Sequence, residues 1–320
     1  ATDVVFDRPC PVCLYLNHQP VFKSGCKTEG KVSIVHKISI QRRLYQMALK
    51  VLMYLASALI ITIFIGIIGY ILYRGIPYVT WQLLSTKPSL IKETIGILPN
   101  LLNTLYIILM TLVVILPLGV GAAIYLNEYA KNKRIVQTIE LAAETLSGIP
   151  SIIYGLAGML LFVQFLNLGT SLIAGALTLA IMTLPTMIRT TQESLKTVPD
   201  SYREGSLALG SGKWHMIRTV VLPSSIEGIV TGCILSIGRI VGESAALLFT
   251  AGMANEIIHF MQAGAPNHPG STLTVALYMY AKERGEFQIA FAIAVILLFL
   301  TFIINMAAKL TARIVKKRKG

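Results

Sequence analysis

Six long apolar stretches divide the chain, and each is close to the length that a helix needs to cross a bilayer. A spanning helix requires about 20 mostly apolar residues, because each residue adds about 1.5 Å along the axis and the hydrocarbon core is about 30 Å thick. The pattern therefore predicts an all-α, polytopic membrane protein with six transmembrane helices. The six stretches cover residues 47–73, 98–126, 147–166, 171–188, 224–252 and 288–310.

The first, third and fourth stretches depart from a simple spanning helix. The first is too long for a cleaved signal peptide and is expected to be retained. The fourth is the shortest and contains Pro185, which a membrane helix tolerates where neighbouring helices satisfy the freed backbone carbonyl. At the start of the third, Pro150 and Ser151 are expected to break the helix and reorient it.

Lys and Arg gather on alternate connections between the stretches. Cytoplasmic loops of membrane proteins carry an excess of these residues, so the N-terminal flank, the 127–146 connection and the C-terminal end are assigned to the cytoplasm. The connections at 74–97, 167–170 and 253–287 hold few basic residues for their length and are assigned to the outside. Both termini are therefore predicted to be cytoplasmic.

The composition agrees with a bilayer as the solvent. Hydrophobic residues make up 54% of the 320 residues and charged residues 13%, which is too apolar for an ordinary soluble domain. A net charge of +13 could suit nucleic acid, but the basic residues lie at the ends of apolar stretches and so indicate membrane topology. The predicted organisation is a poorly ordered cytoplasmic tail at 1–45, a transmembrane domain at 46–312 and a basic cytoplasmic tail at 313–320.

Four cysteines are too few and too scattered for a disulfide framework. Cys10 and Cys13 form a CxxC with Cys26 nearby, so a small zinc site can be considered. A second well-spaced cysteine pair is missing, which favours an ordinary cytosolic tail without metal. Cys233 lies in an apolar stretch and is interpreted as a packing residue.

The longest predicted cytoplasmic connection, residues 189–223, has a pattern of its own. Asp200 or Ser201 can cap a short helix, Gly210 and Gly212 can end it, and a second short helix can occupy residues 213–221. Two helices around a glycine turn predict a docking element for a partner protein. On pattern alone, a surface linker with amphipathic pieces is an equal alternative.

This connection resembles the signature of permease subunits of ATP-binding-cassette (ABC) importers. In that signature, Glu-Ala-Ala is followed by Gly six residues after the Glu and then by an Ile-x-Leu-Pro ending. Small residues replace the two alanines here, which preserves close packing although glycine lowers helix propensity by up to about 1 kcal/mol. The positions that match or replace the signature are Glu204, Gly205, Ser206, Gly210, Val220, Leu222 and Pro223.

Three further stretches, at 123–129, 147–155 and 238–250, resemble the phosphate-specific permeases of the PstA family. The resemblance implies a type I ABC importer permease fold in the bacterial plasma (inner) membrane. This chain would form half of the translocation path for inorganic phosphate. A sister permease subunit, or a permease for another oxyanion such as sulfate or molybdate, is the nearest alternative.

The resemblance also implies the partners. They are a second permease chain similar to PstC, two ATPase subunits similar to PstB, and an extracytoplasmic phosphate-binding protein similar to PstS. The signature residues would contact the ATPase. The chain contains no Gly-rich loop ending in Gly-Lys-Ser or Gly-Lys-Thr, so it is expected to be a transport subunit without catalytic residues or cofactor of its own. ATP and Mg²⁺ would be bound by the partner ATPase, and nucleic acid is not an expected partner.

Two charges interrupt the fifth apolar stretch, Arg239 and Glu243. Their spacing of four predicts one helical face, and a charged residue inside a span usually faces a protein interior or an aqueous path. Arg239 can present a planar fork of donors to phosphate oxygens, so the pair is predicted to line the substrate path, in agreement with the resemblance to PstA. Alternatively, the two charges neutralise each other or pair with the second permease.

The remaining patterns are interpreted as structural. Gly228, Gly232, Gly238 and Gly242 give two small-xxx-small spacings that permit close helix packing. Glu140 and Glu144 are interpreted as a solvated or loop-contacting face rather than a catalytic pair.

The sequence disfavours two other classes of function. An ion-driven carrier should show inverted repeats with broken helices, and no internal repeat is detected. The signature spacing from Glu204 to Pro223 is not expected in a membrane receptor.

Overall fold

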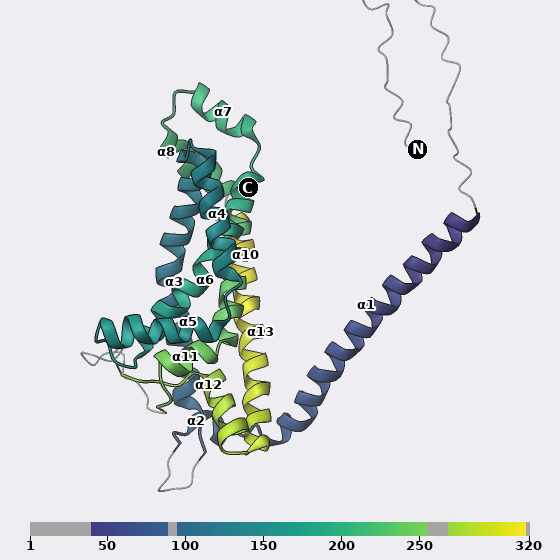
Figure 1. Ribbon diagram of the computed structural model, residues 1–320, viewed down its shortest axis with the longest axis vertical. Helices are drawn as coiled ribbons and strands as arrows, with labels where there is room; N and C mark the ends of the chain where they lie inside the picture. Colours follow the sequence, from purple (N-terminus) through teal and green to yellow (C-terminus); the bar gives the residue numbers. More distant parts are fainter. Residues whose placement is uncertain (1–39, 89–94, 255–267, 318–320) are drawn as a thin grey trace, which may run out of the picture. The chain divides into compact units, whose positions relative to one another are not determined.

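The computed structural model describes residues 40–88, 95–254 and 268–317, without the side chains of 40–43, 312 and 314–317 (Figure 1). The regular elements of these residues are all helices. The helices are α1 (Ile40–Gly75), α2 (Trp81–Ser85), α3 (Leu98–Ile124), α4 (Lys133–Ser147), α5 (Ser151–Gly158), α6 (Leu172–Lys196), α7 (Asp200–Ala208), α8 (Lys213–Met216), α9 (Leu222–Ser224), α10 (Ile226–Gly242), α11 (Ala245–Thr250), α12 (Leu273–Tyr278) and α13 (Phe287–Lys317).

Wider or tighter helical turns extend several of these helices. A short 3₁₀ turn follows α1, and π-helical turns continue α3, α5, α8 and α12. The turns are Ile76–Tyr78, Tyr125–Tyr129, Met159–Phe165, Ile217–Val221 and Met279–Glu283. The candidate zinc residues Cys10, Cys13 and Cys26 lie outside the described residues.

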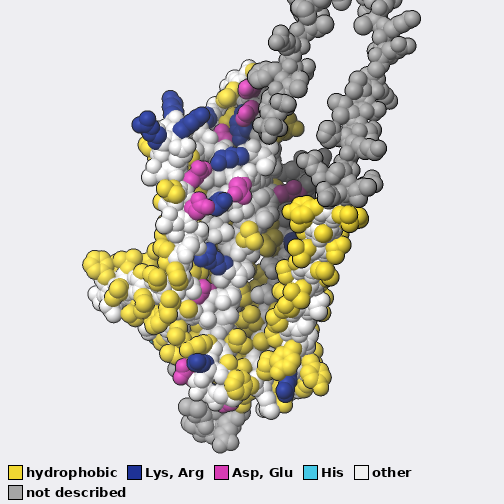
Figure 2. All heavy atoms as spheres, turned by 45° about the vertical axis from the view of Figure 1, so that its right-hand side comes forward, with side chains coloured by type: hydrophobic (Ala, Val, Ile, Leu, Met, Phe, Trp, Pro, Cys, Tyr) yellow, Lys and Arg dark blue, Asp and Glu magenta, His cyan; other side chains and the backbone are white. Residues whose placement is uncertain are grey.

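The chain divides into two units, residues 1–60 and 61–320. The described part of the first unit is the beginning of α1, an uninterrupted apolar helix. The second unit contains the rest of α1 and all other helices. Figure 2 shows that charged side chains of the second unit gather over the end where α7 and α8 lie, whereas hydrophobic side chains cover much of the part below.

Four helices in the described part of the chain are long and apolar enough to cross a membrane: Leu44–Tyr78, Leu98–Tyr129, Leu172–Lys196 and Phe287–Thr311. Two bent helix pairs raise the number to six if each pair is one span. The predicted all-α membrane fold is therefore confirmed. The two pairs are Lys133–Ser147 with Ser151–Phe165 and Lys213–Ser224 with Ile226–Gly242.

The breaks occur where the backbone loses helical hydrogen bonds. Between α4 and α5 the axis turns by 98°, and Pro150 precedes α5 with ψ of 139°. Proline cannot donate a backbone hydrogen bond, so the reorientation expected at this residue is found. Pro185, in contrast, is buried inside α6, which runs without interruption through 25 residues.

The fifth predicted stretch, 224–252, is not a single helix. The axis bends by 66° before α10, α10 ends at Gly242, and a separate helix, α11, begins at Ala245. Pro223, Ser224 and Ser225 precede the first break, and Glu243 and Ser244 lie at the second. These polar interruptions are too short to divide the apolar stretch by hydropathy alone.

The centre of the second unit is α6, which packs against both α3 and α10. The largest buried cluster joins these helices with α5, α11 and α12 and includes Ile107, Leu179, Met182 and Ile240. A second cluster joins α2, α12 and α13. A third surrounds the end of α6 and the Ile217–Val221 turn. The helix that bears Arg239, a predicted path residue, and the predicted docking element are thus both attached to α6.

The glycines of α10 divide into two kinds. A Cβ atom at Gly228 would overlap the side chain of Ser194 on α6, and one at Gly232 would lie 3.1 Å from Sδ of Met187. Nothing lies within 4 Å of a Cβ at Gly238 or Gly242. The first spacing therefore allows α10 to approach α6, and the second leaves an uncovered face.

Replacing Gly228 with alanine is expected to destabilise the protein. The new methyl group would overlap Ser194, and overpacking of this kind costs about 1–3 kcal/mol. The melting temperature in detergent should fall for Gly228→Ala. Gly121→Ala is the matched control, because its Cβ meets nothing within 4 Å and alanine favours the helix. Equal melting temperatures for the two variants would contradict the close contact of α10 with α6.

Candidate functional site

Two short helices, α7 and α8, follow α6 and form the predicted docking element (Figure 1). The turn between them contains Gly210 at φ +81°, a left-handed conformation that favours glycine. The predicted cap is wrong, because neither Asp200 nor Ser201 caps α7. The helix begins at Asp200, and the Asp200 carboxylate instead accepts a hydrogen bond of 2.9 Å from Arg203.

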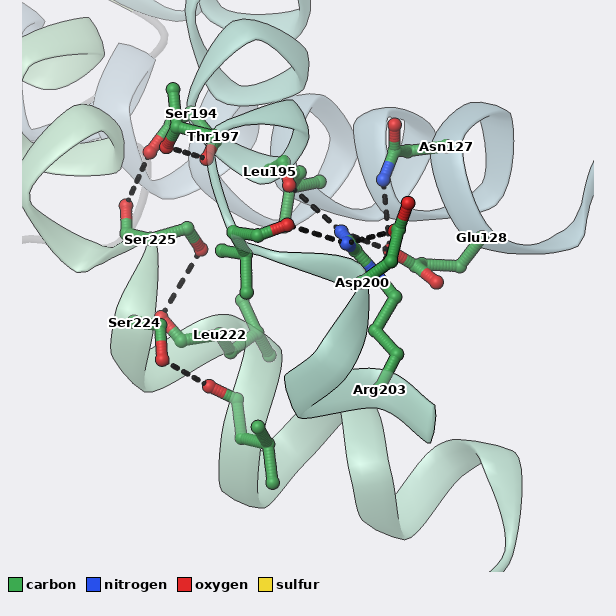
Figure 3. A network of polar contacts seen from close by, with 12 residues as sticks. Asn127, Glu128, Ser194, Leu195, Thr197, Asp200, Arg203, Leu222, Ser224 and Ser225 are labelled. Atoms are coloured by element: carbon green, nitrogen blue, oxygen red, sulfur yellow. Dashed lines mark hydrogen bonds and ion pairs between the residues drawn. The ribbon is translucent and has the colours of Figure 1, made fainter. Parts of the chain in front are cut away.

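Arg203 fastens α7 to two other segments (Figure 3). Its guanidinium lies 3.1 Å from the carboxylate of Glu128, which follows α3, and it donates to the carbonyl oxygens of Leu195 and Val198 at 2.8 and 2.6 Å. The two charged side chains are only 15% and 6% exposed. A cation also suits this position at the end of α6, because the C-terminus of a helix carries partial negative charge.

Sequence reasoning missed this contact. Arg203 directly precedes the signature residue Glu204, and Glu128 is part of the 123–129 stretch, but 75 residues separate the two. The only signal in the sequence was a carboxylate directly after a long apolar helix. Asn127 also donates to the same carboxylate at 2.8 Å, so Glu128 is held from two sides.

The signature residues occupy different environments in this element. Glu204 is exposed on α7, and a Cβ at Gly205 would meet nothing within 4 Å. The hydroxyl groups of Ser206 and Ser211 lie 2.7 Å apart across the turn. Leu222 and Pro223 are half-buried in the short helix α9.

Large apolar side chains on this element are exposed, which the signature did not indicate. Leu209 is 91% exposed, and three aromatic or aliphatic residues on α7 and α8 accompany it. Exposed apolar groups of this size beside a charged residue are typical of an interaction surface. The three are Tyr202, Leu207 and Trp214.

A hydrogen bond links the end of the docking element to α6. The Ser194 hydroxyl donates to the carbonyl oxygen of Ser225 at 2.8 Å, immediately before α10 (Figure 3). Ile217 and Val221 are fully buried below it against Leu195. Movement of α7 and α8 would therefore act on the start of α10.

Arg239 and Glu243 do not share a helical face, so that prediction is wrong. Glu243 follows the last residue of α10 and has an extended backbone, with φ −85° and ψ 123°. Its carboxylate accepts from the backbone N–H of Ala246 at 3.1 Å, and its carbonyl oxygen accepts from Thr274 at 2.9 Å. The carboxylate is used to satisfy a free amide at the start of α11 instead of pairing with Arg239.

Arg239 is half-buried, and no ion pair to it occurs among the described residues. Its guanidinium makes one long contact of 3.5 Å to the Thr186 hydroxyl on α6. Its helical neighbours Leu235, Gly238 and Gly242 are exposed. Arg239 is therefore a cation on the uncovered side of α10, with most of its donors available to an anion.

Glu140 and Glu144 face α6 across a cavity of about 530 Å³ between α4 and α6. Glu140 accepts from Lys196 at 3.2 Å and from Gln192 at 3.3 Å, and Glu144 lies 3.7 Å from Arg189. These partners are about fifty residues away in the sequence, so their pairing was not visible there.

Comparison with known proteins identifies the family. Residues 115–318 match the model of the binding-protein-dependent transport system inner membrane component. The chain belongs to this family. It is an ABC importer permease subunit, a multi-pass component of an inner-membrane transport system rather than an enzyme. This result excludes the ion-driven carrier and the membrane receptor.

Relatives agree with this assignment. The chain is 36% identical over 276 residues to the probable ABC transporter permease protein YqgI of Bacillus subtilis, covering 82% of this chain and 94% of the relative. It is 33% identical over 210 residues to the phosphate transport system permease protein PstA of Haemophilus influenzae, covering 66% and 72%. A PstA homolog of Mycoplasma pneumoniae is 36% identical over 219 residues, which are 66% of this chain and 33% of that longer protein.

Solved structures show the same fold. A bacterial alginate ABC transporter, in complex with a periplasmic protein that holds an alginate pentasaccharide, matches with a TM-score of 0.61 at 13% identity, covering 89% of this chain and 98% of the other. The MetNI methionine ABC transporter in an inward-facing conformation matches with a TM-score of 0.55 at 21% identity, covering 69% and 94%. At these identities the likeness concerns the fold alone.

Removing Arg203 is expected to destabilise the permease more than removing its exposed partner. Arg203→Ala leaves the carboxylate of Glu128 covered and without its cation, a change that costs about 3–5 kcal/mol. Asp200→Asn is the matched control, because this carboxylate is 87% exposed and such pairs contribute about 0–1 kcal/mol. Thermal unfolding in detergent measures both.

A double variant tests whether the ion pair itself is responsible. Arg203→Met with Glu128→Gln removes both charges, so it should be more stable than Arg203→Ala alone. A melting temperature for Arg203→Ala equal to that of Asp200→Asn would show that the pair does not fasten α7.

Proposed function

We propose that this chain is one permease subunit of an ATP-driven importer of inorganic phosphate in the bacterial inner membrane, with both termini in the cytoplasm. The observation that carries the proposal is Arg239, a half-buried cation in α10 without an acidic partner in the described part of the chain. Relatives named as phosphate transport system permeases support the choice of substrate.

The chemistry of Arg239 suits an oxyanion. Its guanidinium offers five donors in a planar fork, and charge-assisted hydrogen bonds from such a fork to phosphate oxygens are strong and directional. The Thr186 hydroxyl lies beside it at 3.5 Å and can donate to the same anion. The Glu243 carboxylate accepts a hydrogen bond from the Ala246 amide, so it does not neutralise Arg239.

The uncovered side of α10 suggests where the second permease lies. An unpaired arginine within a span is costly unless it borders a protein interior or an aqueous path. Gly238 and Gly242 on the same side allow another helix to approach closely. In this proposal a second chain similar to PstC completes the path, and an extracytoplasmic binding protein similar to PstS delivers the phosphate.

The docking element would connect the path to ATP hydrolysis. Glu204 and the exposed apolar residues of α7 and α8 form the surface for an ATPase similar to PstB, which binds ATP and Mg²⁺, whereas this chain holds no cofactor. Gly205, Ser206 and Gly210 shape the element, and α9 with Leu222 and Pro223 transmits its movement. The contacts of Arg203 with Glu128 and of Ser194 with Ser225 attach it to α3, α6 and α10.

Arg239→Gln is expected to abolish most ATP-dependent phosphate uptake by the complete importer in liposomes, because the neutral amide offers fewer donors and no charge. Arg239→Lys keeps the charge without the fork and should retain partial uptake. Sulfate uptake is measured beside phosphate uptake. Unchanged phosphate uptake in Arg239→Gln would remove this residue from the path, and sulfate uptake above phosphate uptake would overturn the substrate.

Changes in the docking element are expected to uncouple the ATPase. A valine at Gly210 cannot adopt φ +81° without strain, which costs about 1–2 kcal/mol or more and distorts the turn. Gly210→Val and Glu204→Arg should both reduce the amount of ATPase that copurifies with the permease. Gly212→Val is the matched control, because its φ of −70° suits any residue. Normal copurification and normal phosphate uptake in Gly210→Val and Glu204→Arg would contradict the docking role.

A further inference from the structure

The cavity between α4 and α6 is lined by charged residues that have no role in the proposed path through Arg239. Three carboxylates and two cations line it, and each carboxylate lies within 4 Å of a cation. Arg189 carries two of these contacts, at 3.7 Å to Glu144 and 3.2 Å to Glu193. The charged residues of the cavity are Glu140, Glu144, Arg189, Glu193 and Lys196.

Thr186 connects this cavity with Arg239. Thr186 lines the cavity and also accepts the contact from the Arg239 guanidinium. Arg189 follows Thr186 by three residues on α6, which is about one helical turn. The two arginines therefore lie at successive levels along α6, with a hydroxyl group between them.

We propose that Arg189 is a second anion-binding residue of the path, lying toward the end of α6 that bears the docking element, and that Glu144 and Glu193 keep its affinity low. This inference rests on the proposed import of phosphate. An anion that leaves Arg239 would enter the cavity and meet a guanidinium already shared by two carboxylates. The weak site lets the anion move on and leave.

The exposure of these groups supports an exchangeable site. The side chains of Arg189, Glu144 and Glu193 are 63%, 67% and 66% exposed. Exposed ion pairs are weak, because water competes for both charges and the long side chains lose conformational freedom when they pair. An incoming phosphate can therefore replace a carboxylate. The pair of Arg203 with Glu128 is covered instead, so water competes little for its charges and the pair holds α7 in place.

The other donors of the cavity fit the same ligand. Ser147, Thr186 and Gln192 line it and provide hydroxyl and amide groups suited to oxyanion oxygens. Lys196 is the second cation, held 3.2 Å from Glu140. Each of the two cations in this cavity lies beside a competing carboxylate, whereas Arg239 has no ion pair among the described residues.

The test measures how much inorganic phosphate the membrane complex retains. Both permeases and the ATPase are placed in nanodiscs without the binding protein and without ATP, and radiolabelled phosphate is titrated. Glu144→Gln and Glu193→Gln should each increase the affinity about two- to five-fold, since each removes one competing pair of this exposed kind. Turnover in liposomes should fall as the anion is released more slowly.

Matched variants separate this effect from a general change in charge. Adding Arg189→Gln to Glu144→Gln should cancel the gain, whereas Arg189→Lys should preserve part of it. Glu283→Gln removes an exposed carboxylate outside the cavity and should leave retention unchanged. Retention equal to that of the parent in both cavity variants, or a gain that persists without Arg189, would overturn the inference.

Phosphate uptake by the parent importer distinguishes a failure of this inference from a failure of the proposed function. A parent that imports phosphate with ATP while the cavity variants retain phosphate like the parent overturns only the role of Arg189. A parent that imports no phosphate overturns the proposed function and this inference together.

Discussion

The covered ion pair of Arg203 with Glu128 is the contact on which the arrangement of the docking element depends. It joins α7 to the turn that continues α3, and the same guanidinium donates to the carbonyl oxygens of Leu195, in the last turn of α6, and of Val198, just beyond it. Two charges at this depth are costly to separate, because either would remain covered without its partner. The contact therefore makes α7 follow the ends of α3 and α6, which a flexible linker could not do.

The attachment continues from the docking element to α10. Ile217 and Val221 are fully buried against the end of α6, and Ser194 binds the carbonyl oxygen of Ser225 just before α10 begins. Gly228, one turn further, allows α10 to contact Ser194 closely. A displacement at α7 and α8 thus reaches α10 through packed atoms, because closely packed groups transmit strain.

Hydrophobic pattern and signature spacing were enough to predict the all-α membrane fold, the turn at Gly210 and the break at Pro150. The pattern failed at the end of α10, because apolar residues continue on both sides of Glu243 and the break lies in the backbone. Pairings such as Glu128 with Arg203 join residues far apart in the sequence. The packing of α3 against α6 and the position of α7 directly after α6 bring them together, so neither periodicity nor spacing could indicate the pair.

Three arginines of this chain have different surroundings, and these suit the different roles proposed for them. Arg203 has a covered carboxylate and two carbonyl oxygens, so its donors are occupied and it holds structure. Arg189 has two exposed carboxylates, which water and other anions can replace. Arg239 has one long hydroxyl contact and no described ion pair. The number and the exposure of competing oxygens decide how firmly each guanidinium can bind a passing anion. On the proposed path, that affinity would be greatest at Arg239 and lower at Arg189, while the donors of Arg203 are already occupied.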